Sequence, residues 1–196
     1  MTEVDNLDPS GEVLADVRSV LTAWIAPTPI QARLRQDYLD FIAEHPEAAA
    51  NRGLRLGHLT ASTLVLDHGR ERVLLTLHPG AGRWFQLGGH IEPGDTSLAG
   101  AALREATEES GIEGLVLDPT PIGLDRHETR CKQSSGQRSP SVHWDIEFLA
   151  VAPPDAQHVI SDESLDLAWF ALDDIPDLAD DVVRDLVARA RQLGRT

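Results

Sequence analysis

Three glutamates near the middle of the chain have the spacing of one helical turn. Glu105, Glu108 and Glu109 lie at i, i+3 and i+4, so on a helix their carboxylates share one face. Like charges placed in this way destabilise a helix by about 0.2–0.5 kcal/mol per pair. Such a cluster favours a compensating cation, and carboxylate oxygens are ligands that Mg²⁺ and Mn²⁺ prefer.

The residues around these glutamates support a binding site. Gly88 and Gly89 precede the helix, and glycine lets the backbone approach a bound phosphate or metal closely. Arg104 can reach a carboxylate on its own helix and hold its rotamer. A solvated acidic helix face is the alternative interpretation. The glycine turn and the closing Gly111, at fixed offsets from the glutamates, favour a site.

The segment 89–112 resembles the Nudix box, G-x5-E-x7-R-E-U-x-E-E-x-G-U, where U is a bulky aliphatic residue. The matching residues are Gly89, Arg104, Glu105, Glu108, Glu109, Gly111 and Ile112. Asp95 replaces the first glutamate, eight residues rather than seven separate it from Arg104, and Ala106 fills an aliphatic position. The extra residue falls in the turn before the helix, so we expect Asp95 to act as a helix N-cap or supporting group.

The resemblance implies an α/β fold, a Nudix-type α/β/α sandwich with a mixed sheet, over about residues 59–193. It implies a divalent-metal-dependent hydrolase, a Nudix pyrophosphohydrolase that cleaves the pyrophosphate linkage of a nucleoside diphosphate derivative or related diphosphate with metal-activated water. The implied cofactor is Mg²⁺ or Mn²⁺. Its implied ligands are Glu105, Glu108, Glu109 and the carbonyl oxygen of Gly88, and Arg104 is a further catalytic residue.

The general base and the groups that bind the substrate lie outside the matched positions. We expect Glu163, in an acidic loop before a strand, to be the base. Glu147 and a box glutamate are alternative bases. Alternatively, the acidic residues of the loop only cap the next element. Arg83 and His90, near the glycine turn, are candidates to bind phosphate. His127, Cys131 and His143 have side chains that can bind a metal, but their spacing matches no tight zinc pattern. Whether they form a second site stays an open question.

The composition limits the partners. The 196 residues include 17 Lys and Arg against 32 Asp and Glu, a net charge of −15, which repels nucleic acid and anionic membranes. We therefore expect a small-molecule diphosphate as the substrate, no nucleic acid polymer and no membrane partner. The acidic N-terminus, the single Cys131 and the lack of a long apolar run are typical of a cytoplasmic protein.

The positions of apolar residues predict the elements that carry the site. Two helices, over residues 11–24 and 30–44, form an N-terminal hairpin interrupted at 26–29 by prolines. We expect residues 1–56 to be this helical extension and 57–196 to be the hydrolase domain. A homodimer contact, a lid and plain packing stay open as roles of the hairpin. The other predicted elements are strands at 59–66, 73–77, 84–87, 115–124, 142–152 and 167–171 and helices at 97–110 and 179–193.

Two other functions compete with hydrolysis. An enzyme similar to isopentenyl diphosphate isomerase would use Cys131 and Glu147, but the residues around Cys131, ETRCKQSSG, do not match that enzyme's cysteine segment. A non-catalytic module that binds a metabolite would have lost box carboxylates, whereas Glu105, Glu108 and Glu109 are all present. The box handles only the pyrophosphate, so the rest of the substrate stays open.

Overall fold

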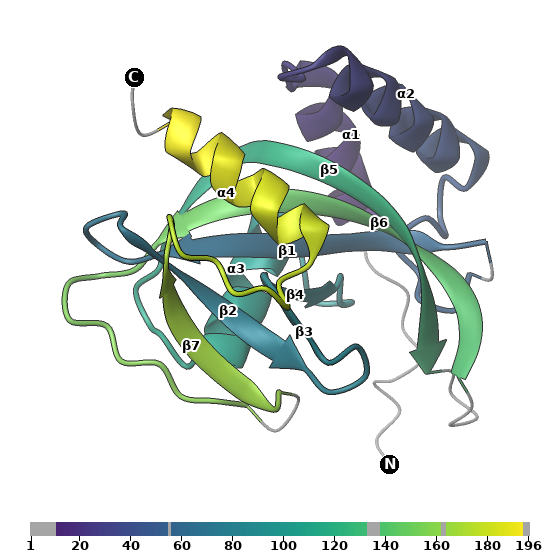
Figure 1. Cartoon of the computed structure of the whole chain (residues 1–196). Coiled ribbons are helices and arrows are strands. Elements are labelled where there is room, and N and C mark those ends of the chain that lie inside the picture. Colours follow the sequence, from purple (N-terminus) through teal and green to yellow (C-terminus); the bar gives the residue numbers. More distant parts are fainter. Residues whose placement is uncertain (1–10, 55, 133–137, 162–163, 194–196) are drawn as a thin grey trace. The chain divides into compact units, whose positions relative to one another are not determined.

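The computed structural model describes residues 11–54, 56–132, 138–161 and 164–193. Seven strands form one sheet in the order β3-β2-β1-β6-β5, with β4 beside β1 and β7 beside β2 (Figure 1). The chain divides into two compact units. The first contains Met1–Ala61, His90–Ala101 and Gly123–Ile146, and the second contains Ser62–Gly89, Ala102–Ile122 and Glu147–Thr196.

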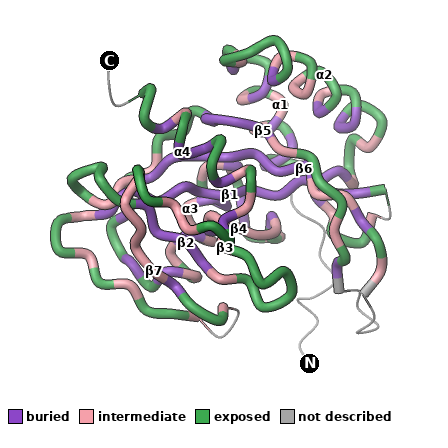
Figure 2. Tube along the Cα trace, viewed as in Figure 1, coloured by how far each residue is buried: buried purple, intermediate pink, exposed green. Residues whose placement is uncertain are grey.

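In the second unit, helices cover both faces of the sheet. β1 (His58–Leu66) is buried along its whole length (Figure 2), and alternate residues of a strand point to opposite faces. Leu64 and Leu66 pack with α4 (Asp181–Leu193). Val65, between them, belongs to the other cluster, which includes Ala106 of α3 (Leu98–Ser110). The predicted Nudix-type α/β/α sandwich is confirmed.

The edge of the sheet is built by antiparallel pairs. β2 (Arg72–His78) pairs with β1, with β3 (Arg83–Phe85) and with β7 (Asp166–Ala171). The prediction of one strand over 84–87 is wrong, because the chain leaves β2 after Phe85 and pairs with β1 as β4 (Leu87–His90). This change of partner places Gly88 and Gly89, the glycine pair, in a strand.

Two long strands run through both units. β5 (Val116–Lys132) and β6 (Arg138–Val151) are neighbours in the sheet, and both extend beyond the predicted ranges. β5 also contains two prolines, at 119 and 121. A strand at the end of the sheet order tolerates proline, because one row of its backbone groups has no neighbouring strand to bond.

The predicted N-terminal helical hairpin is present in the first unit. α1 (Gly11–Ala23) and α2 (Pro29–Glu44) are in contact. Thr28 caps α2, because its side chain accepts a hydrogen bond from the Gln31 amide at 3.2 Å, and Pro29 occupies the first turn, where it costs no hydrogen bond. α2 buries Tyr38, Phe41 and Ile42.

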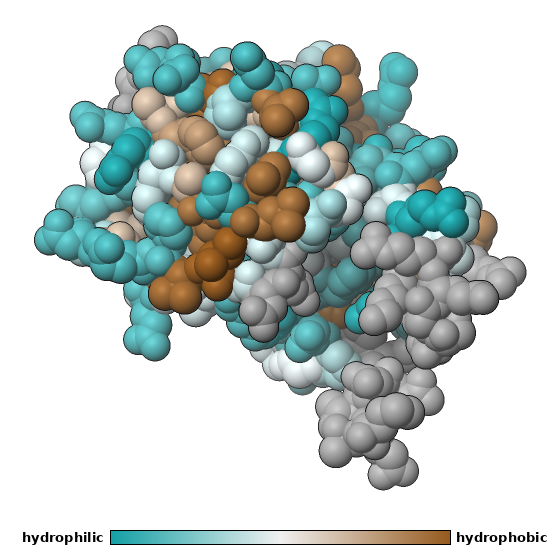
Figure 3. Space-filling model, turned by 60° about the horizontal axis from the view of Figure 1, so that its bottom comes forward, coloured by the Kyte–Doolittle hydropathy of each residue, from teal (hydrophilic) through white to brown (hydrophobic). Residues whose placement is uncertain are grey.

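Apolar side chains interrupt the hydrophilic face drawn in Figure 3. The exposed apolar residues include Val159, Ile160 and Leu165, in the segment between β6 and β7, with exposed fractions of 65%, 47% and 61%. None of the helices in the described part of the chain has the length and apolar character needed to cross a membrane.

Candidate active site on helix α3

Helix α3 begins at a different cap from the one predicted. Ser97 accepts a hydrogen bond from the Gly100 amide at 3.1 Å, and the Asp16 carboxylate accepts one from the Leu98 amide at 2.7 Å. Asp95 instead accepts a hydrogen bond from the Glu92 amide at 2.7 Å, so it closes the preceding turn. The prediction that Asp95 caps the helix is wrong, because the helix starts three residues later.

The other end of α3 is fixed by Gly111. Its φ is +65°, a value that glycine adopts at low cost, and its amide donates to the Thr107 carbonyl at 2.8 Å. The Val159 amide donates to the Ser110 carbonyl at 2.7 Å. These bonds hold the helical turn that carries the glutamates.

Arg104 connects two of the three glutamates. Its Nη1 lies 3.0 Å from Oε1 of Glu105 and 3.0 Å from Oε2 of Glu108. The Glu105 side chain is only 15% exposed, whereas that of Glu108 is 60% exposed. One guanidinium thus orients a half-buried carboxylate and an exposed one.

The glycine pair of β4 meets the other carboxylates. The Gly88 amide donates to Oε2 of Glu109 at 2.9 Å. A β-carbon on Gly89 would lie 2.7 Å from the carboxylate of Glu105, a distance that real β-carbons do not adopt. The glycines of the box therefore let a strand backbone lie directly against the acidic face of α3.

This arrangement fits a hard divalent cation. α3 carries three glutamates and one arginine, so its own basic residue balances only one of three negative charges. Glu105 and Glu109 converge on the backbone of β4. An oxygen-rich donor set of this kind suits Mg²⁺ or Mn²⁺.

Two of the predicted residues outside the box have other surroundings. Arg83 donates to the carbonyl of Ala179 at 3.1 Å and lies 3.4 Å from the Asp180 carboxylate. Glu147 is 1% exposed, and its Oε2 lies 3.3 Å from Nη1 of Arg189 on α4. Glu163 lies outside the described residues. The roles predicted for these residues stay predictions.

His90 belongs to a second cluster, in the first unit. One ligand atom from each of His58, His90, Cys131 and His143 lies within 4.8 Å of the others. Burial and, next, the neighbouring His90 lower the pKa of His58 to about 3, and burial followed by His58 lowers that of His143 to about 2. Both imidazoles are therefore neutral near pH 7.

The sequence alone does not join these four residues. It offers Cys131 and His143 as ligand types together with His127, and His90 as a candidate to bind phosphate. The four residues are separated by 32, 41 and 12 positions in the chain, so no short motif joins them. Only the pairing of strands brings them together.

The family model of the NUDIX domain matches residues 57–190. The fold is similar to that of a NUDIX family hydrolase from Clostridium perfringens (23% identity, TM-score 0.52, covering 69% of this chain and 97% of that one). It is also similar to that of the MutT protein from Methanosarcina mazei Go1 (20% identity, TM-score 0.53, covering 73% of this chain and 99% of that one). A third similar structure is that of the E. coli dihydroneopterin triphosphate pyrophosphohydrolase (19% identity, TM-score 0.50, covering 69% of this chain and 96% of that one). No curated protein matches the chain.

Proposed function

The chain belongs to the NUDIX family of hydrolases, and on that premise we propose that it cleaves the pyrophosphate linkage of a nucleoside diphosphate derivative or a related diphosphate with the help of Mg²⁺ or Mn²⁺. The observation that carries the proposal is the contact of Glu105 and Glu109 with the glycine backbone of β4. The hydrogen bond to the Gly88 amide orients one carboxylate, and the absence of a side chain at Gly89 makes room for the other.

Each residue of the box has a task in this proposal. Glu105, Glu108, Glu109 and the carbonyl of Gly88 would hold the ion. Arg104 fixes the rotamers of two of these carboxylates through its 3.0 Å contacts. When bound, the ion would neutralise charge on the diphosphate and lower the pKa of a water molecule. A protein with a net charge of −15 needs such help to bind a polyanion.

The reaction is an in-line displacement at phosphorus. A water oxygen forms a bond to phosphorus, the bond from that phosphorus to the bridging oxygen breaks, and a carboxylate accepts the proton of the water. We propose Glu163 as this carboxylate, on the basis of the acidic sequence SDES, residues 161–164, that precedes β7. The burial of Glu147 against Arg189 argues against the alternative base, because a buried ion pair is held away from solvent.

The proton acceptor can be identified from kinetics. We expect Glu163→Gln to lower kcat by about 100-fold or more and to remove the acidic limb of the pH–rate profile. Glu147→Gln is the matched comparison. If it abolishes that limb while Glu163→Gln keeps it, Glu147 is the base and the assignment of Glu163 is wrong.

The hydrolase proposal is tested with a substrate panel. The panel holds sugar nucleotides, ADP-ribose-like compounds, nucleoside triphosphates including oxidised ones, dinucleoside polyphosphates and non-nucleotide diphosphates, each assayed with Mg²⁺ and with a chelator. We expect Mg²⁺-dependent release of phosphorylated products from at least one class. Glu109→Gln should lower that activity by about 100-fold or more.

Glu113→Gln is the matched control, because Glu113 is an exposed glutamate just beyond α3. The proposal is wrong if Glu109→Gln turns over the substrate as fast as Glu113→Gln does. Stoichiometric binding of a panel compound with no product over hours would instead indicate a binding module. The isomerase alternative needs Cys131 to reach a substrate, whereas this side chain is only 5% exposed.

A further inference from the structure

We infer that His58, His90, Cys131 and His143 form a second metal site, which binds a zinc-type transition-metal ion and stabilises the first unit. These residues come from four strands: the start of β1, the end of β4, β5 and β6. His90 follows Gly89 directly, but none of the residues that match the box belongs to this cluster. The inference does not rest on the proposed hydrolysis.

The spacing of the ligand atoms fits a tetrahedral ion. Zinc bonds of about 2.0–2.3 Å to nitrogen and sulfur place neighbouring ligand atoms about 3.3–3.8 Å apart. The Cys131 sulfur lies 3.2 Å from Nε2 of His143 and 4.0 Å from Nε2 of His58. Since all four ligand atoms lie within 4.8 Å of one another, small side-chain movements complete the geometry.

The burial of the cluster also favours a metal ion. His58 is fully buried, and among the described residues its Nδ1 has no hydrogen-bond partner. Cys131 is 5% exposed. Histidine binds metal as a neutral imidazole, through either ring nitrogen. A bound ion would bond to the ring nitrogens and the sulfur that meet inside the first unit.

The ligand types select the class of ion. Three imidazoles and one thiolate form a nitrogen and sulfur set, which zinc prefers and which Mg²⁺ and Ca²⁺ do not. Four protein ligands also leave no open position for a substrate. We therefore assign a structural role to this site, in contrast to the oxygen set of α3.

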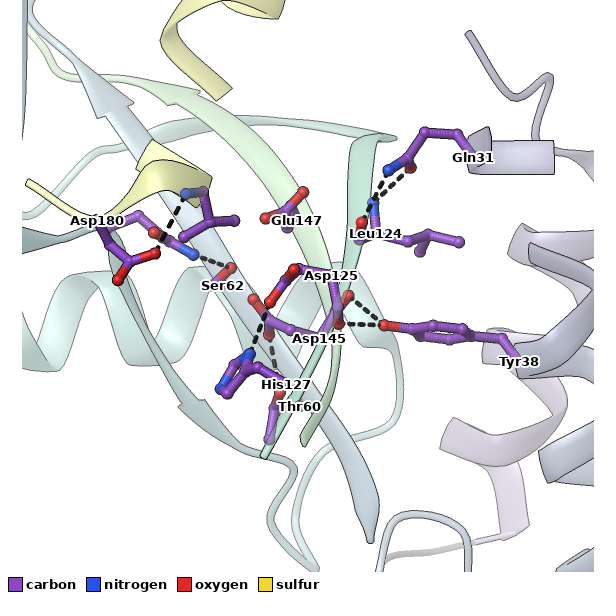
Figure 4. A network of polar contacts seen from close by, with 12 residues as sticks. Gln31, Tyr38, Thr60, Ser62, Leu124, Asp125, His127, Asp145, Glu147 and Asp180 are labelled. Atoms are coloured by element: carbon purple, nitrogen blue, oxygen red, sulfur yellow. Dashed lines mark hydrogen bonds and ion pairs between the residues drawn. The ribbon is translucent and has the colours of Figure 1, made fainter. Parts of the chain in front are cut away.

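Neighbouring contacts in the same unit hold the ligand strands in place. The Tyr38 hydroxyl of α2 shares hydrogen bonds with the carbonyls of Asp125 on β5 and Asp145 on β6, at 2.5 and 2.7 Å (Figure 4). The Thr60 hydroxyl donates to the Asp145 carboxylate at 2.8 Å. Thr60 and Asp145 each lie two residues beyond a ligand histidine, His58 and His143, so these bonds fix the register in which the ligands meet.

The test uses the full chain, with Zn²⁺ and Co²⁺ as probes. We expect the purified protein to bind about one Zn²⁺ per chain at this site. Co²⁺ in its place should give the intense visible bands of a tetrahedral ion and a thiolate-to-cobalt charge-transfer band. Cys131→Ser should lose that band and weaken Zn²⁺ binding by more than about 100-fold, since even residues that only support a ligand contribute 10–100-fold.

Two control variants separate this site from other sites. His127→Ala removes a histidine on the same strand as Cys131, with a side chain 48% exposed, and should keep the cobalt spectrum. Glu109→Gln removes a box carboxylate and should keep it as well. If the wild-type chain gives no charge-transfer band with Co²⁺, the inference is overturned without any variant. Zinc binding that survives Cys131→Ser but is lost in Glu109→Gln would overturn it too, and would assign the ion to the box.

Discussion

Gly89 is the residue at which the box has least room for change. A β-carbon there would lie 2.7 Å from the Glu105 carboxylate. The obstructing atoms are the end of a side chain, so the fold can adapt while the carboxylate moves away. A displacement of about 1 Å at such a position costs about 100-fold in rate.

We therefore predict that Gly89→Ala lowers kcat by about 10–100-fold and leaves the free energy of unfolding almost unchanged. Steady-state kinetics and urea denaturation measure the two effects. Gly94→Ala is the matched control, because nothing lies within 4 Å of a β-carbon at that glycine. Equal kcat values for the two variants would show that the close approach to Glu105 has no role in catalysis.

Among the elements, the hairpin between β1 and β2 depends on one carboxylate. Asp67 accepts hydrogen bonds from the amides of Glu71 and Arg72 at 2.8 and 3.0 Å, and from the Arg72 guanidinium at 2.8 Å. Burial raises the pKa of Asp67, but the bonds from Arg72 and the Glu71 amide outweigh it and hold the pKa below 3.8.

We predict that Asp67→Ala lowers the free energy of unfolding by about 1–2 kcal/mol at pH 7. Because the folded pKa is the lower one, this stabilisation is present above pH 3.8 and disappears as the pH falls through the folded pKa. Urea denaturation of both proteins across this range measures the difference. A difference that does not diminish as the pH is lowered further and further below 3.8 would refute the assignment to the charged carboxylate.

The elements also show how far the sequence predicts the fold. Helix α4 is predictable because its apolar residues recur on one face, and Val183, Leu186 and Val187 are indeed buried. The start of the helix is harder to predict from the sequence. Asp180 accepts a hydrogen bond from the Val182 amide at 3.2 Å (Figure 4). The helix therefore begins at Asp181 and not at Ala179. Leu193, predicted in the apolar stripe, is 51% exposed, because it is the last residue of the helix.

Other features depend on contacts that no local pattern records. The second half of β5 carries charged side chains, including Arg126, Glu128 and Arg130, so its apolar pattern stops at Leu124 although the strand continues. The box was predictable because its residues lie close together in the chain, on one helix and at the end of the short strand before it. The cluster of His58, His90, Cys131 and His143 was not, because it depends on strand pairing.

At the scale of the molecule, the predicted division at residue 56 can be tested by truncation. In the first unit, Phe41 stacks on Trp144 with ring centroids 4.5 Å apart, and Tyr38 meets the same ring edge-on at 5.0 Å. The Gln31 side chain bonds both backbone groups of Leu124, at 2.8 and 2.9 Å. Removal of the helical hairpin would expose Trp144 and leave these backbone groups without their partner.

We predict that a chain of residues 57–196 is markedly less stable than the full chain, by several kcal/mol, or does not stay in solution. Thermal denaturation compares the two, and Tyr38→Phe in the full chain isolates the hydroxyl, at an expected cost of about 1–2 kcal/mol. If residues 57–196 unfold at the same temperature as the full chain, the hairpin is an independent extension and not part of this unit's core.

The proposed hydrolysis requires that the glutamates of α3 bind a divalent ion. Manganese binding, followed by the electron paramagnetic resonance of Mn²⁺, tests it without any knowledge of the substrate. We predict that the wild-type chain and Glu113→Gln bind Mn²⁺ alike, and that Glu105→Gln and Glu109→Gln each bind it at least about 10-fold more weakly. Equal Mn²⁺ affinity in all four proteins would show that these glutamates do not bind the ion.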